Sequence, residues 1–269
     1  MSKQTASFTG EIPAIYDHHL GPVIFEPYAR DIAARLECPD GGRVLELAAG
    51  TGIVTRHLVA ALPADAQLVV SDLNAPMLEI GQAKLPADPR VSFRVVDAQA
   101  LPFEDATFDR IVCQFGVMFF PDKPLAFREA KRALKPGGRL LFNVWGDIED
   151  NSNARVTHAI MPTFFANDPP KFYEVPFGWH DERTILDTLA GAGFHAPKLE
   201  WVDLDTTAES AAHFSVGLVK GNPISLEIAE RGTAPIEDVR VAVERGLIRE
   251  GGDKPWRGRL RALVVSATA

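Results

Sequence analysis

The nine residues from Val44 to Gly52, VLELAAGTG, join an apolar run to a loop of very small side chains. Such side chains let a backbone approach a ligand closely, and in open α/β sheets ligands lie just beyond the carboxyl ends of the strands. Glu46 lies in this apolar run, and Asp72 ends the next one. A carboxylate at the second place can accept hydrogen bonds from both hydroxyls of a ribose. The pattern indicates a site for an adenosine-containing cofactor.

Two further details distinguish between such cofactors. A dinucleotide-binding fingerprint expects glycine or alanine three residues after its second glycine, and Thr55 stands there. A third apolar run ends in Asp97, followed by Ala98. A carboxylate there can accept from the adenine amino group while the next backbone N–H donates to a ring nitrogen. Acids at three successive strand ends favour a nucleoside site without pyrophosphate binding.

Alternating strands and helices must position these residues. Short runs rich in Val, Leu and Ile are typical of buried parallel strands, and their alternation with helices predicts a Rossmann-like, doubly wound α/β fold. The strands are expected at 43–48, 67–72, 91–96, 108–114 and 139–145. The helices between them are expected near 52–62, 75–84 and 122–135, the last of which is closed by a turn at Pro136-Gly137-Gly138.

The regions before and after this core do not show the regular alternation of strands and helices. Helical spacing is expected at 22–37, and the aromatic and proline-rich segment 146–180 is too irregular for a plain crossover helix, so it is interpreted as a lid or pocket wall. After it we expect a helix at 181–191, a strand at 198–204, mostly helices over 208–250 and a last strand at 259–267. The domain organisation predicted is one domain, 1–269, with a helical cover at 1–40, a cofactor-binding core at 41–146, and insertions on the substrate side at 147–180 and 206–256.

Four stretches resemble the class I S-adenosylmethionine-dependent methyltransferases, and among them the branch of the ubiquinone and menaquinone biosynthesis methyltransferases. They are VLELAAGTG, the strand ending SDL with Met77 behind it, DAQALPFEDATFDRIVCQFGVMFF and EAKRALKPGGRLLFNVW, in family order over about 43–145. Residues 7–35 resemble the leader of some members more loosely. Ala48 stands where the family usually has its first glycine. The resemblance implies a mostly parallel seven-stranded sheet with an antiparallel last strand and a helical lid.

The resemblance also implies roles for individual residues, with S-adenosylmethionine as the cofactor and S-adenosylhomocysteine as its product. The pocket for the methionine and ribose part would be shaped by Glu46, Ala48, Gly50 and Gly52. The adenosine would be held by Asp72 at the ribose hydroxyls, Leu73 and Met77 beside the adenine, and Asp97 with Ala98 at its edge. Gln114 would lie near the sulfonium and the methionine amine, with Phe115–Phe120 facing the substrate.

Methyl transfer is an in-line displacement in which positioning and the exclusion of water can supply most of the acceleration. A phenol, a hydroxyl or a carbon acid would also need a base, for which His18, His19 and His180 are the candidates. Aromatic side chains at 164–179 indicate an apolar or aromatic small-molecule acceptor. No metal site is expected, because the two cysteines lack metal-ligand spacing and the one compact Asp/Asn group is interpreted as a loop. This group is Asp147, Asp150, Asn151 and Asn153.

Composition excludes several classes of protein. The formal net charge is −8 over 269 residues, which opposes binding to a nucleic acid backbone. The beginning of the chain lacks a signal pattern, no stretch reaches the roughly 18 apolar residues of a membrane helix, and the cysteines form no disulfide framework. We expect a soluble cytoplasmic protein without membrane insertion. Two alternatives stay open: a nicotinamide-dependent oxidoreductase, and a catalytically silent protein that binds S-adenosylmethionine.

Overall fold

A computed structural model describes residues 8–269, so residues 1–7, on which the expected absence of a signal pattern partly depends, lie outside the described part. The described chain divides into two compact units. Unit 1 comprises 8–27, Trp145–Gly178 and Val202–Ala262, and unit 2 comprises Tyr28–Val144, Trp179–Trp201 and Leu263–Ala269. The domain boundaries expected from the sequence stay predictions.

Helices and strands alternate through unit 2, as the sequence pattern predicts. The strands are β1 (Arg43–Glu46), β2 (Gln67–Asp72), β3 (Val91–Val95), β4 (Phe108–Gln114), β5 (Leu134–Trp145), β6 (His195–Ala208) and β7 (Trp256–Thr268), of which β5, β6 and β7 continue into unit 1. The helices of unit 2 are α2 (Glu26–Ala34), which begins in unit 1, α3 (Ile53–Ala61), α4 (Ala75–Lys84), the short 3-10 helix η2 (Val117–Phe119), α5 (Lys123–Ala133) and α7 (Glu182–Gly191).

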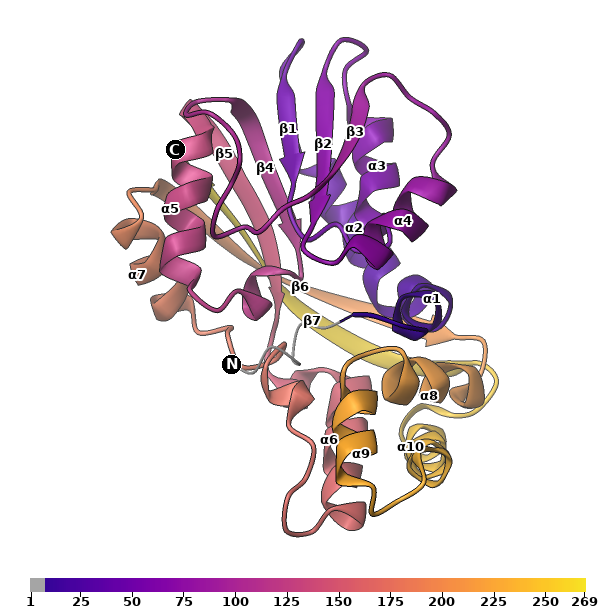
Figure 1. The fold of residues 1–269 in the computed structure, drawn as a ribbon. Helices are drawn as coiled ribbons and strands as arrows, with labels where there is room; N and C mark the ends of the chain where they lie inside the picture. Colours follow the sequence, from indigo (N-terminus) through magenta and orange to yellow (C-terminus); the bar gives the residue numbers. More distant parts are fainter. Residues whose placement is uncertain (1–7) are drawn as a thin grey trace. The chain divides into compact units, whose positions relative to one another are not determined.

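The sheet has the order β3-β2-β1-β4-β5-β7-β6 (Figure 1). Strands β1 to β5 run parallel, with Leu45 in register with Val69 and Ile111. Strand β7 is antiparallel to β5, because Gly137 donates to the carbonyl of Ala269 at one end and Gly146 to that of Arg261 at the other. A mostly parallel seven-stranded sheet with flanking helices confirms the predicted fold class.

Several expected elements differ from the structure. Strand β3 lies at the sheet edge and each of its residues is at least partly exposed, so the expectation of a buried strand is wrong for this one. Pro136-Gly137-Gly138 does not form a separate turn: α5 ends at Ala133, and β5 begins at Leu134 and runs through the three residues. Strand β6 extends beyond 198–204 at both ends, because it pairs along β7.

Unit 1 begins with a short helix, α1 (Ile12–Ile15), and a π-helix, η1 (Tyr16–Phe25). The sequence predicts one helix over 22–37, whereas the structure has η1 followed directly by α2. Pro22 lacks an N–H group and its ring crowds the preceding turn of an α-helix. The wider turn accommodates it, and at its end the N–H of Glu26 donates to the carbonyl of Gly21, five residues back.

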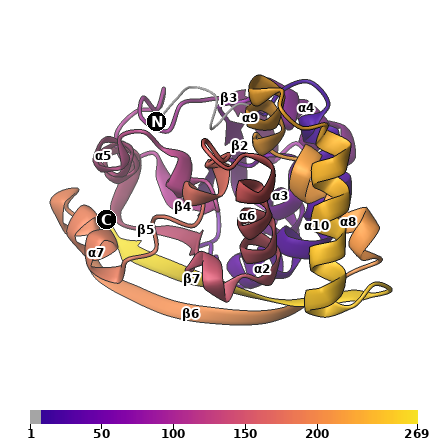
Figure 2. The same ribbon diagram turned by 90° about the horizontal axis from the view of Figure 1, so that it is seen from below.

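The rest of unit 1 is mainly helical: η3 (Ile148–Asp150), α6 (Ser152–Phe164), η4 (Phe172–Glu174), α8 (Ala211–Lys220), α9 (Ile224–Arg231) and α10 (Ile236–Gly251). Helix α10 packs against both α6 and α8 (Figure 2). The expectation of helices over 208–250 is confirmed, but 146–180 contains a regular helix, α6, which the irregular spacing of its aromatics concealed. Within residues 8–269, none of the helices has the length and apolar character needed to span a membrane.

Candidate cofactor site

The loop from Ala48 to Gly52, between β1 and α3, has an unusual backbone. Ala48, Gly50 and Gly52 have φ angles of 52°, 57° and 76°, in the left-handed region that glycine adopts at least cost. The N–H of Ala49 donates to the carbonyl of Ser71 at 2.9 Å, and the Ser71 hydroxyl donates to the carbonyl of Glu46 at 2.7 Å. These bonds fix the loop to the ends of β1 and β2, at the edge of the sheet where ligands bind.

One face of α4 supports this loop. Met77 Cε lies 3.4 Å from the position that a Cβ atom at Gly50 would take, so the Met77 side chain packs against the loop. One helical turn later, a Cβ at Gly81 would lie 3.2 Å from the backbone nitrogen of Gly52. Gly81 therefore lets the helix backbone approach the loop backbone closely. Gly81 was not among the predicted site residues, although a glycine one turn after Met77 inside a helical pattern was a usable signal.

Asp72 holds two loops at the end of β2. Its Oδ2 accepts from the N–H of Gly50 at 2.9 Å, and its Oδ1 accepts from the N–H and the side-chain amide of Asn74 at 2.7 and 3.3 Å. Burial raises the pKa of Asp72, and these hydrogen bonds offset part of the effect. A carboxylate has about four acceptor positions, and these three bonds together with the Leu73 N–H account for them. A further donor such as a ribose hydroxyl would therefore replace the weakest of them, the 3.3 Å contact with the Asn74 amide.

Glu46 is 1% exposed, and within residues 8–269 neither carboxylate oxygen makes a hydrogen bond of normal geometry. Burial raises its pKa to about 8, and the charge of Asp72 adds to the rise. Thr55 lies close enough to lower the pKa in part, and its hydroxyl is also buried. Buried polar atoms are normally paired, so two carboxyl oxygens without partners at the end of β1 indicate that a polar or charged ligand group binds there.

The other residues predicted to contact the adenosine lie on neighbouring loops. Asp97 follows β3 and is exposed, and its Oδ1 accepts from the N–H of Gln99 at 2.8 Å. Gln99 Oε1 in turn accepts from the N–H of Asp122, which ties this loop to the start of α5. Ala98 is buried, whereas the Leu73 side chain is 57% exposed immediately after Asp72. An apolar side chain exposed beside a ribose-type carboxylate fits packing against a base.

Gln114, at the end of β4, is half-buried and pairs in register with Asn143 of β5. The next residue, Phe115, has φ of 52°, and its N–H donates to Asn143 Oδ1 at 2.9 Å. Asn143 is fully buried, and its Nδ2 has no hydrogen-bond partner in the described chain. Asn143 was not among the predicted site residues, although a lone amide within the apolar run LLFNVW was a signal for it.

The three histidines proposed as bases lie in different units. His180 belongs to unit 2 and follows Trp179, whose ring packs near Phe127 and Phe142. His18 and His19 belong to η1 of unit 1, where the structure brings them together with His213 of α8. Burial lowers the pKa of His19, and the nearby His213 and His18 lower it further.

The sheet order aligns the predicted cofactor residues of unit 2 in one row. Asp97, Asp72, Glu46 and Gln114 follow or end β3, β2, β1 and β4, which are neighbours in that order. Because the carboxyl ends of parallel strands meet at one edge, the row runs from an exposed acid through two buried acids to a polar amide. The arrangement can hold an elongated ligand that carries both hydroxyl groups and a positive charge.

Known proteins are similar to this chain in sequence. A family model described as a methyltransferase domain matches residues 44–138. A ubiquinone/menaquinone biosynthesis C-methyltransferase of Saccharophagus degradans is 45% identical over 175 residues, which cover 59% of this chain and 69% of that protein. A demethylmenaquinone methyltransferase of Clavibacter sepedonicus is 36% identical over 204 residues, covering 71% and 82%. Among the first curated relatives the match covers 42% to 69% of their own length.

Solved structures share the fold. A structure described as a putative methyltransferase from Bacillus halodurans has a TM-score of 0.59 at 20% identity, covering 89% of this chain and 97% of that one. A phosphoethanolamine N-methyltransferase 2 of Haemonchus contortus, solved with S-adenosyl-L-methionine, has a TM-score of 0.61 at 16% identity, covering 99% and 60%. At these identities the likeness concerns the fold alone.

Proposed function

The chain belongs to the class I S-adenosylmethionine-dependent methyltransferases, in the branch of the ubiquinone and menaquinone biosynthesis enzymes, and we propose that it methylates a small aromatic acceptor from S-adenosylmethionine bound in unit 2. The observation that carries this proposal is the pair Glu46 and Asp72, two buried acids on adjacent strand ends beside a loop with three left-handed residues. A buried acid whose oxygens lack partners, beside a second acid with one long contact that can yield, fits a ligand that combines hydroxyl groups with a cation.

S-adenosylmethionine, when bound, supplies a methyl group activated by a sulfonium charge. In our proposal Asp72 accepts hydrogen bonds from the ribose hydroxyls of S-adenosylmethionine. Glu46 faces the positively charged methionine part of this cofactor, because the Glu46 oxygens lack partners within the described residues. Gly50, Gly52 and Ala48 give the ligand access to the loop backbone. The adenine end is assigned to Asp97 of the row and to three residues near the ends of β2 and β3: Leu73, Met77 and Ala98. Gln114 then orients the methionine end.

The acceptor is proposed from the names of the curated relatives, which describe a C-methyltransferase acting in ubiquinone and menaquinone biosynthesis. By analogy we propose an electron-rich aromatic ring with a hydroxyl group, whose carbon or oxygen attacks the methyl group. A base at the acceptor would take the proton that the ring or the hydroxyl releases. His180 shares its unit with the cofactor residues and is our first candidate, ahead of His18 and His19.

Calorimetry on the full chain tests the cofactor. S-adenosylmethionine and S-adenosylhomocysteine should bind saturably, and Asp72→Ala should weaken both by roughly 10- to 100-fold, because hydrogen bonds to a charged group contribute about 1.5 to 3 kcal/mol each. Asp187→Ala is the matched control, since this exposed aspartate of α7 makes only a 3.8 Å ion pair with Arg183. Unchanged affinity in Asp72→Ala would refute the assigned site.

The same titration with NADH separates the oxidoreductase alternative. Binding of NADH without binding of the two sulfur nucleosides would refute the methyltransferase proposal. Incubation of the protein with S-adenosylmethionine and a panel of quinols and phenols, followed by assay of S-adenosylhomocysteine, tests turnover. Tight cofactor binding with no product from any acceptor would support the catalytically silent alternative.

A further inference from the structure

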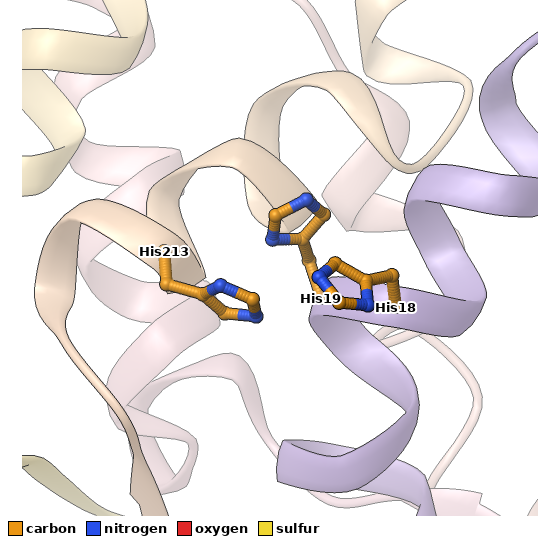
Figure 3. A group of neighbouring side chains, drawn as sticks. All are labelled: His18, His19 and His213. Atoms are coloured by element: carbon orange, nitrogen blue, oxygen red, sulfur yellow. The ribbon is translucent and has the colours of Figure 1, made fainter.

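Three histidines from two helices of unit 1 face one another (Figure 3). His18 and His19 are adjacent in η1, and His213 lies in the first turn of α8. The ring centroids of His19 and His213 are 4.1 Å apart, and those of His18 lie 4.7 Å from His19 and 5.1 Å from His213. One ring nitrogen of each residue lies within 4.8 Å of the corresponding nitrogens of the other two. No other trio of potential metal ligands in the described chain meets this spacing.

Close packing of the two helices produces this cluster. A Cβ atom at Gly217, one turn after His213 on α8, would lie 2.6 Å from Leu20 Cδ2 and 2.8 Å from His19 Cβ. The absence of a side chain at Gly217 therefore brings the backbone around His19 against the face of α8 that carries His213. At the start of α8 the Ser210 hydroxyl oxygen accepts from the N–H of His213 at 3.0 Å, which fixes the first turn. The backbone thus holds His19 and His213 close together, and rotation of their side chains stays possible.

The cluster also contains an unpaired ring nitrogen. Nδ1 of His19 is buried, and within residues 8–269 it has no hydrogen-bond partner. Buried polar atoms are normally paired, so an unpaired nitrogen here indicates that a ligand binds to it. His18, by contrast, is exposed, which gives an ion in solution access to the cluster. A buried acceptor nitrogen with an accessible edge is the arrangement that a bound ion requires.

We propose that His18, His19 and His213 bind one divalent transition-metal ion, with Zn²⁺ as the first candidate. Imidazole nitrogens suit zinc, copper and nickel, whereas magnesium and calcium prefer oxygen ligands. Zinc–nitrogen bonds of about 2.0 to 2.1 Å place tetrahedral nitrogens roughly 3.4 Å apart. The present nitrogens lie within 4.8 Å, so small side-chain rotations bring all three to one ion. Three protein ligands leave a fourth position for water or an anionic oxygen ligand.

The proposal revises the sequence analysis, which expected no metal site and assigned His18 and His19 as candidate bases. His213 lies almost 200 positions further along the chain than these two, so no local spacing could reveal the trio. Histidines whose nitrogens coordinate an ion cannot also accept a proton from an acceptor molecule. The base role of the proposed methyl transfer then falls to His180.

A zinc titration of the full chain tests the site. Protein dialysed against EDTA and then freed of chelator should bind one Zn²⁺ per chain in calorimetry. His18→Ala and His213→Ala should each weaken binding at least 10-fold, whereas His195→Ala, which removes an exposed histidine outside the cluster, should leave it unchanged. His18 is exposed, so its removal leaves the packing of the fold intact, and circular dichroism checks this for every variant.

Cobalt gives a second readout that loosely bound ions do not reproduce. Co²⁺ at the site should show the intense visible bands of four-coordinate geometry, and these should disappear in His18→Ala and His213→Ala. The proposal is refuted if the two variants bind Zn²⁺ as tightly as the wild type. It is equally refuted if His195→Ala weakens binding to the same extent, since this would mean that ions bind to surface histidines in general.

Discussion

The Cβ atom of Ala48 fills the space that the missing side chain of Gly116 leaves open. A Cβ built at Gly116 would lie only 2.4 Å from Ala48 Cβ and 2.8 Å from Cys113 Sγ. Ala48 stands where the resemblance to the methyltransferases implies a glycine, and it has the left-handed φ of 52° that a glycine would adopt more easily. The loop therefore tolerates alanine at this position because a glycine lies opposite, at the end of β4.

Exchanging the two residues should show this coupling. Gly116→Ala should lower the free energy of unfolding by about 1 to 3 kcal/mol, the usual cost of overpacking a filled core. Ala48→Gly alone should change it by less than about 1 kcal/mol, because relief of the left-handed backbone and the greater freedom of glycine when unfolded nearly cancel. The double variant should recover part of the loss, since Cys113 still crowds the new methyl group. Urea unfolding of the four proteins measures this, and strictly additive effects would contradict the coupling.

Gly81 should matter for the cofactor loop. A methyl group at this position would lie 3.2 Å from the backbone nitrogen of Gly52, and backbone atoms yield less easily than a flexible side chain. Gly81→Ala should push α4 away from the loop and weaken S-adenosylmethionine binding at least 5-fold in calorimetry. Gly191→Ala is the matched control, because a Cβ there meets nothing within 4 Å. Equal affinity in both variants would show that the close approach of α4 does not shape the site.

Glu46 should give the ligand-free protein a characteristic pH dependence. Its pKa is raised from 4.5 to about 8 in the folded protein, so between these values the unfolded chain has lost a proton that the folded protein keeps. The contribution of Glu46 is therefore most favourable below pH 4.5 and is lost as the pH rises toward 8, at up to about 1.4 kcal/mol per pH unit. Glu46→Gln, which stays neutral, should flatten this part of the profile.

Urea unfolding at pH 5, 6, 7 and 8 provides the measurement. The free energy of unfolding of Glu46→Gln minus that of the wild type should grow steadily across the series. Glu79→Gln, which removes an exposed acid of α4, should show no such trend. A constant difference between Glu46→Gln and the wild type would mean that Glu46 is ionised throughout, despite its burial.

The sequence predicted the core of unit 2 well because its signals are local there. The acids of β1 and β2 lie directly beside the small-residue loop, so motif and geometry coincide. Features that depend on packing between distant segments could not be predicted from local sequence patterns. The contact of Gly116 with Ala48 joins residues 68 positions apart, and the meeting of His213 with His19 joins residues 194 positions apart. The π-helix was also missed, because apolar spacing does not separate it from an α-helix.

Asn143 offers a test of whether a buried donor is kept for function. Its Oδ1 accepts from the N–H of Phe115, but its Nδ2 has no partner in the described chain, which costs about 1 to 3 kcal/mol in a protein without ligand. Asn143→Leu removes this unpaired donor together with one hydrogen bond worth about 1 kcal/mol. The N–H of Phe115 keeps a second acceptor, the backbone carbonyl of Asn143 at 3.2 Å.

The two changes in Asn143→Leu oppose each other, so the free energy of unfolding should stay within about 1 kcal/mol of the wild type or rise. If Nδ2 donates to the bound ligand, the same variant should bind S-adenosylhomocysteine at least 5-fold more weakly, because the site then lacks a donor for the ligand. Stability and affinity would thus move in opposite directions, which a merely structural residue does not produce. A fall in stability with unchanged affinity would assign Asn143 to the support of Phe115 alone.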